Sequence, residues 1–230
     1  DHAFSYPYFK ITSTIWRFKY VNMWTQFNHP DNATDFGWNA FPVKFGAFHY
    51  LSFTAGKRWN LSLFENVIWQ AQDSTGYRGF DLNYLNPMIF YRPVEWTQGS
   101  PDNVFMGANL SFIPHNWFTL YTQFVIDEFR LSEIKAGNGW FANKYAWQAG
   151  IKSFNPFNIK NLYLQAEHNL VRPYMYSHYL TTQNYSHYKE PLAYSFGANT
   201  KETLLIGRYN VGRFFVNLKY NKAVFGLDST

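Results

Sequence analysis

The sequence predicts an all-β protein, an antiparallel transmembrane β-barrel, on the basis of three observations. Apolar and polar residues alternate over segments of about ten to thirteen residues, which is long for a soluble strand but suits a tilted strand that crosses a membrane. The connections between these segments alternate between short and long. Finally, 22% of the residues are aromatic and 15% are charged, whereas a soluble domain carries about 25% charged residues.

The composition excludes several other classes of protein. A chain so rich in aromatic residues and so poor in charge is not disordered. It contains no apolar run of about 18 residues, which argues against membrane-spanning helices. The absence of cysteine excludes disulfides, cysteine-ligated metals and thiol nucleophiles. The net charge of +5 is spread along the chain without a basic run, so we expect no nucleic-acid partner.

Alternation defines most of the strands, while segments 43–54, 60–71 and 199–209 are less cleanly periodic but have the same length. In segment 213–222, for example, Phe214, Val216 and Leu218 fall on one face while Asn217 falls on the other. We count nine strands, with a tenth placed within 4–12. The nine cover 16–25, 43–54, 60–71, 103–113, 117–128, 143–153, 160–171, 199–209 and 213–222.

The connections favour a membrane barrel, which has tight periplasmic turns at one rim and long extracellular loops at the other. The long connections are 28–42, 72–102, 130–142 and 172–198, and the short ones are 55–59, 114–116, 154–159 and 210–212. In this arrangement the apolar rows face lipid and the polar rows line a hydrated lumen. The alternative is a soluble protein that packs its apolar rows inward.

We expect residues 1–230 to form a single β-barrel domain, because no boundary, repeat or low-complexity tract interrupts the chain. The first residues lack the basic and apolar regions of a signal peptide. The last residues lack the terminal aromatic usual for outer-membrane barrels. We therefore expect a fragment that lacks N-terminal strands and the C-terminal end.

Charged residues within the polar rows are expected to face the lumen and to pair with opposite charges. They are Arg17, Lys19, Glu65, Asp127, Lys144, Lys152, Glu167, Arg213 and Lys219. No carboxylate pair has a separation that the sequence defines, as a glycosidase would need, and the seven histidines are scattered. We therefore expect no catalytic residues, no metal site and no cofactor, and do not expect an enzyme.

The long loops combine aromatic residues with Arg and Asn, which suits a sugar site, since aromatic rings stack on sugar faces and Arg supplies a planar fork of donors. The candidate sugar-binding pairs are Trp96 with Arg92, Trp140 with Asn138, and Tyr176 with Arg172. Alternatively, these aromatic residues pack the loops into a lid over the lumen.

Several segments resemble the Wzi-like capsule-assembly outer-membrane family, in particular its branch of gliding-motility outer-membrane proteins. They are 64–69, 77–87, 127–129, 135–144 and 172–178. The resemblance implies a bacterial outer-membrane barrel of about eighteen strands, of which this chain would be roughly the second half. It also implies a surface lectin that anchors exported polysaccharide.

Three functions remain open at this point. The first is an outer-membrane barrel that binds or anchors exported polysaccharide, or supports surface adhesins and gliding motility. The second is a structural or accessory subunit of an outer-membrane protein-export complex. The third is a soluble, aromatic-rich carbohydrate-binding β protein. The expected partners are outer-membrane lipid, surface polysaccharide and other outer-membrane subunits of an export or gliding complex.

Overall fold

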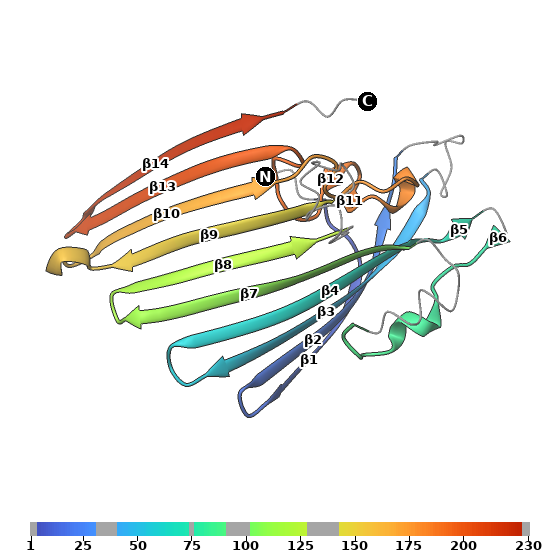
Figure 1. Cartoon of the computed structure of the whole chain (residues 1–230), viewed down its shortest axis with the longest axis horizontal. Helices are drawn as coiled ribbons and strands as arrows, with labels where there is room; N and C mark the ends of the chain where they lie inside the picture. The colour runs from blue at the N-terminus through green and yellow to red at the C-terminus, as the bar shows by residue number, and fades with distance from the viewer. Residues whose placement is uncertain (1–3, 31–40, 74–75, 91–101, 128–142, 227–230) are drawn as a thin grey trace. The chain divides into compact units, whose positions relative to one another are not determined.

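The computed structural model describes residues 4–30, 41–73, 76–90, 102–127 and 143–226 of the chain. In this part of the chain, ten strands form one sheet in the order β1-β2-β3-β4-β7-β8-β9-β10-β13-β14 (Figure 1). The prediction of an all-β, antiparallel protein is confirmed. Within the described residues β1 and β14 are the two edges of the sheet and no closed barrel is formed, so the barrel itself stays a prediction.

The ten strands lie where the alternation places them. Their bounds are β1 Tyr8–Ile15, β2 Phe18–Asn28, β3 Val43–Ala55, β4 Trp59–Gln70, β7 Asn103–His115, β8 Phe118–Ile126, β9 Tyr145–Phe154, β10 Leu162–Val171, β13 Thr200–Val211 and β14 Phe214–Phe225. The tenth strand, β1, begins four residues later than the predicted segment 4–12. Period-two alternation located most of these strands, whereas β3, β4 and β13 were predicted from segments that are less cleanly periodic but of the same length.

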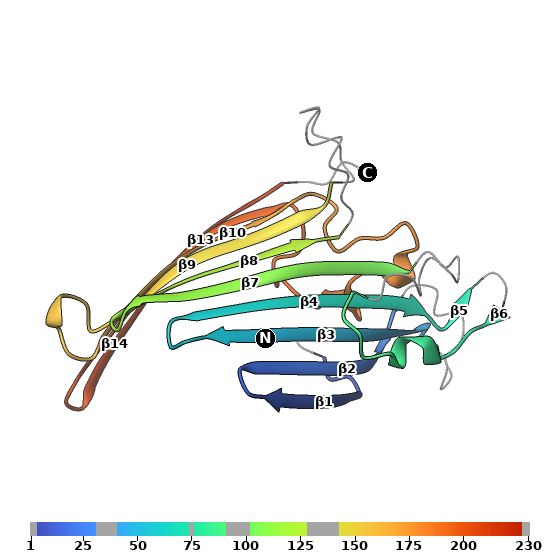
Figure 2. The same ribbon diagram turned by 60° about the horizontal axis from the view of Figure 1, so that its bottom comes forward.

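Short elements occupy the connections of the main sheet, visible beside it in Figure 2. They are β5 Gln72–Asp73, β6 Gly76–Tyr77, η1 Leu82–Leu85, η2 Pro156–Asn158, η3 Thr181–Gln183, β11 Ser186–His187 and β12 Glu190–Pro191. Strands β5 and β6 pair with each other, as do β11 and β12.

Tight turns join the strands at one end. Trp16 and Arg17 link β1 to β2, and Gly212 and Arg213 link β13 to β14. Trp16 and Gly212 have φ of 53° and 55°, the left-handed conformation that two-residue hairpins require. The connections from β3 to β4, β7 to β8 and β9 to β10 are also short, whereas those that follow β2, β4, β8 and β10 are long. The predicted alternation of short and long connections is therefore confirmed among the described strands.

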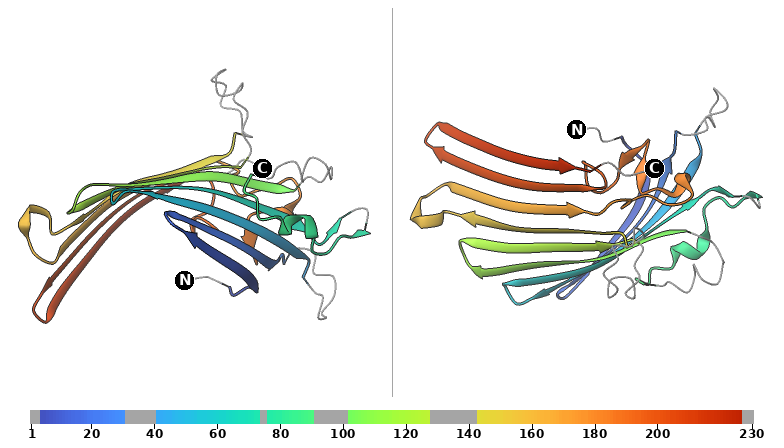
Figure 3. Two further views of the ribbon diagram at one scale, coloured as in Figure 1. Left: turned by 90° about the horizontal axis from the view of Figure 1, so that it is seen from below. Right: turned by 45° about the horizontal axis from the view of Figure 1, so that its top comes forward.

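The chain divides into two compact units. Unit 1 comprises 1–51, 63–106 and 176–197, and unit 2 comprises 52–62, 107–175 and 198–230. The views in Figure 3 help to follow the strands through each unit. The single-domain organisation stays a prediction. Among the described residues, no helix is long and apolar enough to cross a membrane.

The core of unit 1 is an aromatic cluster between the strands and the loop that follows β4. Trp24, Ala47, Val67, Trp69 and Tyr84 are its buried members. The ring of Trp69 stacks on that of Tyr84 with 4.4 Å between centroids. Such stacking adds to the free energy gained from burying these large side chains.

Candidate functional site

Apolar side chains form a continuous exposed face on unit 2. The strand register places Leu120, Ile151, Ala166, Leu205 and Tyr220 opposite one another on five neighbouring strands. Leu120 is 40% exposed, Leu205 44% and Tyr220 56%. Large contiguous apolar patches are uncommon on soluble monomers and mark contact with a membrane or a partner.

The opposite face of these strands carries a hydrogen-bonded set of side chains, which we call the polar ladder. Its members are Tyr121, Gln165, Glu167, Asn169, Glu202 and Asn221. The Tyr121 hydroxyl donates to Glu167 Oε2 at 2.5 Å. Gln165 Nε2 donates to the Tyr121 hydroxyl oxygen at 2.9 Å. Tyr121 belongs to β8, and both of its partners belong to β10. The hydroxyl of Tyr121 therefore bonds across the intervening strand β9.

Gly150 is the position that allows this connection. On β9 it lies between Tyr121 of β8 and Glu167 of β10 in the register. A Cβ atom at Gly150 would lie 2.4 Å from the Tyr121 hydroxyl oxygen. The ring of Tyr121 thus crosses β9 over the space that a side chain would otherwise fill.

Asn169 joins the two carboxylates of the polar ladder. Its Nδ2 donates to Glu167 Oε1 at 2.9 Å and to Glu202 Oε2 at 2.8 Å. Asn221 Nδ2 donates to Glu202 Oε1 at 2.6 Å. Neutral amide donors therefore satisfy oxygens of both glutamates, which suits carboxylates that line a polar surface.

Two of the predicted charge positions lie together at one end of the polar face. Lys144 Nζ is 3.7 Å from Asp127 Oδ2, and both side chains are nearly inaccessible to solvent. Lys152 instead places its ammonium over the ring of Tyr121, 4.7 Å from the centroid, in a cation–π contact. The expected pairing of opposite charges thus holds for Asp127 and Lys144, whereas Lys152 and Glu167 contact the same tyrosine.

Three of the predicted lumen positions need correction. Glu65 shares a face of β4 with the buried Val67 and Trp69, and it accepts a hydrogen bond from the Phe90 backbone N–H at 2.5 Å. The prediction that it belongs to a polar row is wrong, because its neighbours at period two, Leu63, Val67 and Trp69, are apolar. Arg17 and Arg213 are exposed and lie in hairpin turns rather than within strands.

The remaining two positions, Lys19 and Lys219, lie on strands β2 and β14. Lys219 alternates with the apolar Leu218 and Tyr220 and so belongs to the polar row of β14. Their orientation toward a lumen stays a prediction.

Residues 176–191, which we call the Tyr185 loop, pack on one face of the unit 1 strands. The ring of Tyr185 lies 4.5 Å from that of Phe105 and 6.3 Å from that of Phe48, centroid to centroid. Asn66 Nδ2 donates to its hydroxyl oxygen at 3.0 Å. Burial raises the pKa of Tyr185 above its usual value, so the phenol stays protonated.

Hydrogen bonds from and to Asn184 and His187 also hold the Tyr185 loop in place. The buried Lys44 donates from Nζ to the Asn184 carbonyl at 2.6 Å. The backbone N–H of Asn28 donates to His187 Nδ1 at 3.1 Å, and the other ring nitrogen, Nε2, lies 3.3 Å from the Ser5 carbonyl. These two contacts fix His187 as the neutral tautomer with its proton on Nε2, since a carbonyl only accepts.

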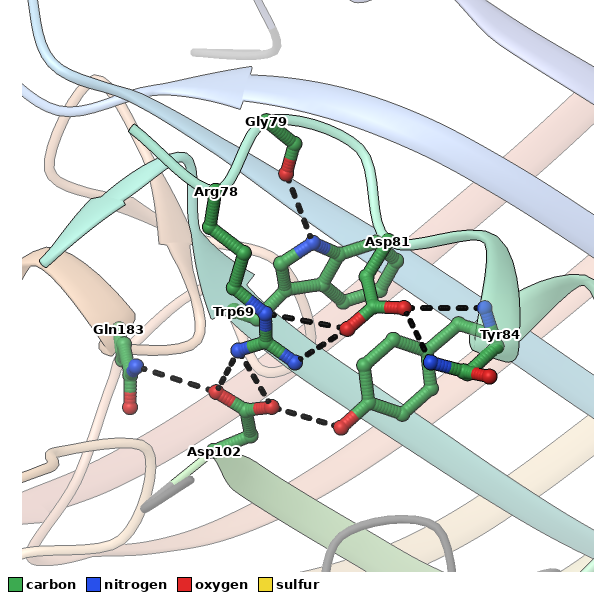
Figure 4. A network of polar contacts seen from close by, with 8 residues as sticks. Trp69, Arg78, Gly79, Asp81, Tyr84, Asp102 and Gln183 are labelled. Atoms are coloured by element: carbon green, nitrogen blue, oxygen red, sulfur yellow. Dashed lines mark hydrogen bonds and ion pairs between the residues drawn. The ribbon is translucent and has the colours of Figure 1, made fainter. Parts of the chain in front are cut away.

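Residues 76–90, which we call the Arg78 loop, are held by a second polar network (Figure 4). Arg78 Nη1 lies 3.0 Å from both oxygens of the buried Asp102, and its Nη2 lies 2.7 Å from Asp81 Oδ2. The Tyr84 hydroxyl donates to Asp102 at 2.6 Å, and Gln183 Nε2 lies 3.4 Å from the same carboxylate. This network is a structural anchor, because its charges bind one another.

The pKa values of this network follow from these contacts. Burial opposes the charged form of Arg78, but the carboxylates of Asp102 and Asp81 outweigh it and raise the pKa of the guanidinium. Burial likewise opposes ionisation of Asp81, and hydrogen bonds from Arg78 and Asn83 reverse the balance and lower its pKa. The charged state of the network is thus favoured at neutral pH.

The two loops cover opposite faces of the same strands. Trp69 of β4 packs under the Arg78 loop, whereas Asn66 and Gln70 contact the Tyr185 loop. Neighbouring side chains of a strand point to opposite faces. The alternative in which both long loops form a lid over one face is therefore corrected, because the described parts of the two loops lie on opposite faces of these strands.

Most of the predicted sugar-binding residues lie outside the described part of the chain, namely Arg92, Trp96, Asn138 and Trp140. Tyr176 is half-buried, and its ring stacks on Tyr185 and lies beside Phe105. Arg172 places its guanidinium 5.6 Å from the ring centroid of Tyr145. Tyr176 thus contributes to the packing of its own loop, as the lid alternative expects.

The polar ladder offers amide, carboxylate and phenol groups for hydrogen bonds to a polar solute. Among the described residues, no cluster of three or more potential metal-ligating side chains is found. Sequence reasoning named Glu167 but not Tyr121, Asn169 or Glu202. A glycine in the middle of strand 143–153 was the available signal, because it marks a close approach by a neighbouring side chain.

Comparison with known proteins found no match to the chain among family models, curated proteins or solved structures. The resemblance to the Wzi-like family therefore stays a prediction that rests on the segments named above.

Proposed function

We propose that this chain forms part of the wall of a bacterial outer-membrane β-barrel whose apolar rows face lipid and whose polar ladder lines a hydrated lumen. One observation carries the proposal: the row that contains Leu120 and Leu205 is exposed, while the reverse face is joined by hydrogen bonds. Strands of 9 to 13 residues in β2, β3, β4, β7 to β10, β13 and β14 have the length that a tilted crossing needs.

A soluble carbohydrate-binding protein is less consistent with this distribution. Such a protein would bury the row that contains Leu164, Leu205 and Leu218 and expose the polar row. In the described residues Leu218 is 69% exposed, whereas Glu202 and Asn169 are buried. Burying apolar area provides much of the free energy of folding in water, and lipid contact removes the need to do so.

The role that we propose for this barrel is to hold exported polysaccharide at the cell surface. The ladder supplies planar amides and carboxylates together with the ring of Tyr121, a combination that can bond to sugar hydroxyls. Tyr163 adds a second ring, with the Arg208 guanidinium 5.5 Å from its centroid. The resemblance to capsule-assembly proteins supports the same role.

The membrane part of the proposal is tested with single cysteines, because the chain contains none of its own. Leu164→Cys and Gln123→Cys carry a nitroxide label in reconstituted bilayers. We expect the label at 164 to be accessible to oxygen dissolved in lipid and the label at 123 to a water-soluble relaxation agent. Accessibility to the aqueous agent at both sites would support the soluble alternative.

The polysaccharide part is tested on cells that produce intact protein. Asn169→Ala removes the donor that joins both carboxylates of the ladder, and Thr203→Ala changes a residue of the apolar row of β13 as a matched control. We expect the first variant to retain several-fold less polysaccharide at unchanged protein levels. Retention equal to that of the control would refute a role of the ladder in sugar binding.

The alternative role, an accessory subunit of an export complex that supports surface adhesins and gliding motility, is favoured by one observation. Tyr176, a predicted sugar-binding residue, is half-buried and stacks on Tyr185 of its own loop. Isolation of the intact protein in mild detergent distinguishes the roles. A stoichiometric export complex that forms without polysaccharide supports the alternative, and polysaccharide without such a complex supports the first role.

A further inference from the structure

An apolar groove lies in unit 1 between the first strands and the Arg78 loop. Its volume is about 300 Å³, and its walls include Phe9, Trp24, Phe45, Phe80 and Leu85. The rings of Phe9 and Trp24 stack with their centroids 5.9 Å apart. Phe9 is 62% exposed and Leu85 44%, so the groove opens at the surface of the described residues.

Two polar side chains in the wall of this groove are bonded within the protein. Trp24 Nε1 donates to the Tyr84 carbonyl at 2.7 Å. Thr25, whose side chain is buried, donates from Oγ1 to the Gly46 carbonyl at 3.4 Å. A sugar needs several hydrogen-bonding partners in addition to a ring on which to stack, whereas the wall of this groove is predominantly apolar. An uncharged hydrocarbon fits its chemistry.

The outer side of the Arg78 loop is also uncharged. Arg78 and Asp81 are the only charged residues in the sequence from 76 to 90; they pair with each other, and Arg78 also pairs with Asp102. The side chains left outside include Leu82, 73% exposed, and Met88, 63% exposed. A loop in water has no need to keep both of its charges away from the solvent. In contact with lipid, an unpaired charge on the outer side would lose its hydration at a high cost in free energy, so the observed arrangement suits a loop that contacts lipid.

The groove continues into an exposed apolar row on the same face of β1. The register pairs Phe9 with Trp24 and Ile11 with Asn22, which places Phe9, Ile11 and Ile15 on one side of the strand. Ile11 is 44% exposed and Ile15 74%. In the proposed function this side faces lipid.

We propose that the groove holds one acyl chain of an outer-membrane lipid, with the Arg78 loop packed against the lipid-facing side of the barrel. This inference rests on the proposed function, because it takes the face that carries Phe9 and Trp24 as the side in contact with lipid. The Tyr185 loop, on the other face, then covers the lumen alone.

The test uses the full chain in phospholipid vesicles that contain a lipid with a photoactivatable diazirine on its acyl chain. We expect lipid cross-links on the peptide that contains Phe9 and on the peptide that contains Leu85. Leu85→Asp places a charge at the groove and should lower cross-linking at Phe9 at least five-fold. Leu82→Phe, on the same 3-10 helix but outside the groove lining, adds no charge and should leave cross-linking at Phe9 unchanged.

A second variant, Leu85→Phe, narrows the groove without a charge and should also lower cross-linking at Phe9. Cross-links at Leu120 report the proposed membrane face independently. Labelling at Leu120 without labelling at Phe9 overturns the groove proposal alone, and labelling at neither residue overturns both. In intact outer membranes, a protein cross-linked at Phe9 in place of lipid would also overturn the groove proposal.

Discussion

At the scale of single residues, glycine and histidine positions decide which contacts form. Gly150 leaves room for the Tyr121 ring to cross a strand and reach Glu167. His187 joins the Tyr185 loop to Asn28 and Ser5 through its two ring nitrogens. A substitution at Gly150 would fill the space that the Tyr121 ring occupies, and a substitution at His187 would remove a ring-nitrogen contact. Both effects should be measurable as changes in stability.

Gly150→Ala should destabilise the protein by about 1–3 kcal/mol, because the added methyl displaces Tyr121 and leaves the Glu167 carboxylate short of a donor. Gly207→Ala is the matched control, since a Cβ there meets only Leu164 at an ordinary 3.7 Å. Thermal unfolding in detergent measures both. Equal stability of the two variants would show that Tyr121 does not need the space above residue 150.

The Tyr185 loop should loosen in acid. Burial lowers the pKa of His187, and the nearby Lys44 lowers it further, although the Ser5 carbonyl opposes the shift. A depressed histidine pKa means that the stabilisation is complete above about pH 6.5 and is lost as the pH falls toward the folded-state value. Glu190, the register partner of His187, is the acidic group on the loop itself.

Hydrogen exchange of residues 184–191 between pH 7.5 and 5, corrected for intrinsic rates, tests this expectation. His187→Asn keeps an acceptor for the Asn28 N–H at the position of Nδ1 but does not titrate, so it should abolish the pH-dependent step. His115→Asn, at the exposed end of β7, is the control. A step that persists in His187→Asn would assign the acid response to another group.

Removal of Arg78 should release its loop. Arg78→Met leaves the fully buried Asp102 side chain without its cationic partner, and breaking a buried ion pair in this way costs about 3–5 kcal/mol. Limited proteolysis within residues 76–90 measures the release. Arg58→Met, at the exposed turn between β3 and β4, should leave the cleavage pattern unchanged.

At the scale of secondary structure, each strand presents chemically different rows to its two sides. On β8, Leu120 belongs to the exposed apolar row and Gln123 to the polar row. Strand positions could be predicted because alternation is a local property of the sequence. Glu65 interrupts the apolar row of β4 that contains Leu63 and Val67, so its charge alone is a poor guide to its row.

Leu120→Arg should destabilise the reconstituted protein by about 2–4 kcal/mol if residue 120 lies near the bilayer midplane. Gln123→Arg on the same strand should cost much less, because its row faces water in the proposed lumen. Urea titration in lipid vesicles measures the difference. Similar costs at both positions would indicate that the two faces have the same environment.

At the scale of the whole molecule, short turns alternate with long connections along the chain. Tyr179 of the Tyr185 loop is 70% exposed, and Lys57 lies in the exposed turn between β3 and β4. On intact cells an impermeant reagent should label Tyr179→Cys, and it should label Lys57→Cys only after the outer membrane is opened. The reverse pattern would invert the proposed orientation.

The sequence by itself determined the strands, the alternation of their connections and the two rows of each strand, since these depend on period-two patterning and on turn residues close together in the chain. Only the tertiary structure decided that the Arg78 and Tyr185 loops cover opposite faces of unit 1. It also decided that Tyr121 reaches Glu167 across Gly150 and that Arg78 binds Asp102. These contacts join residues 24 to 119 positions apart, and separations of that size leave no periodic signal in the sequence.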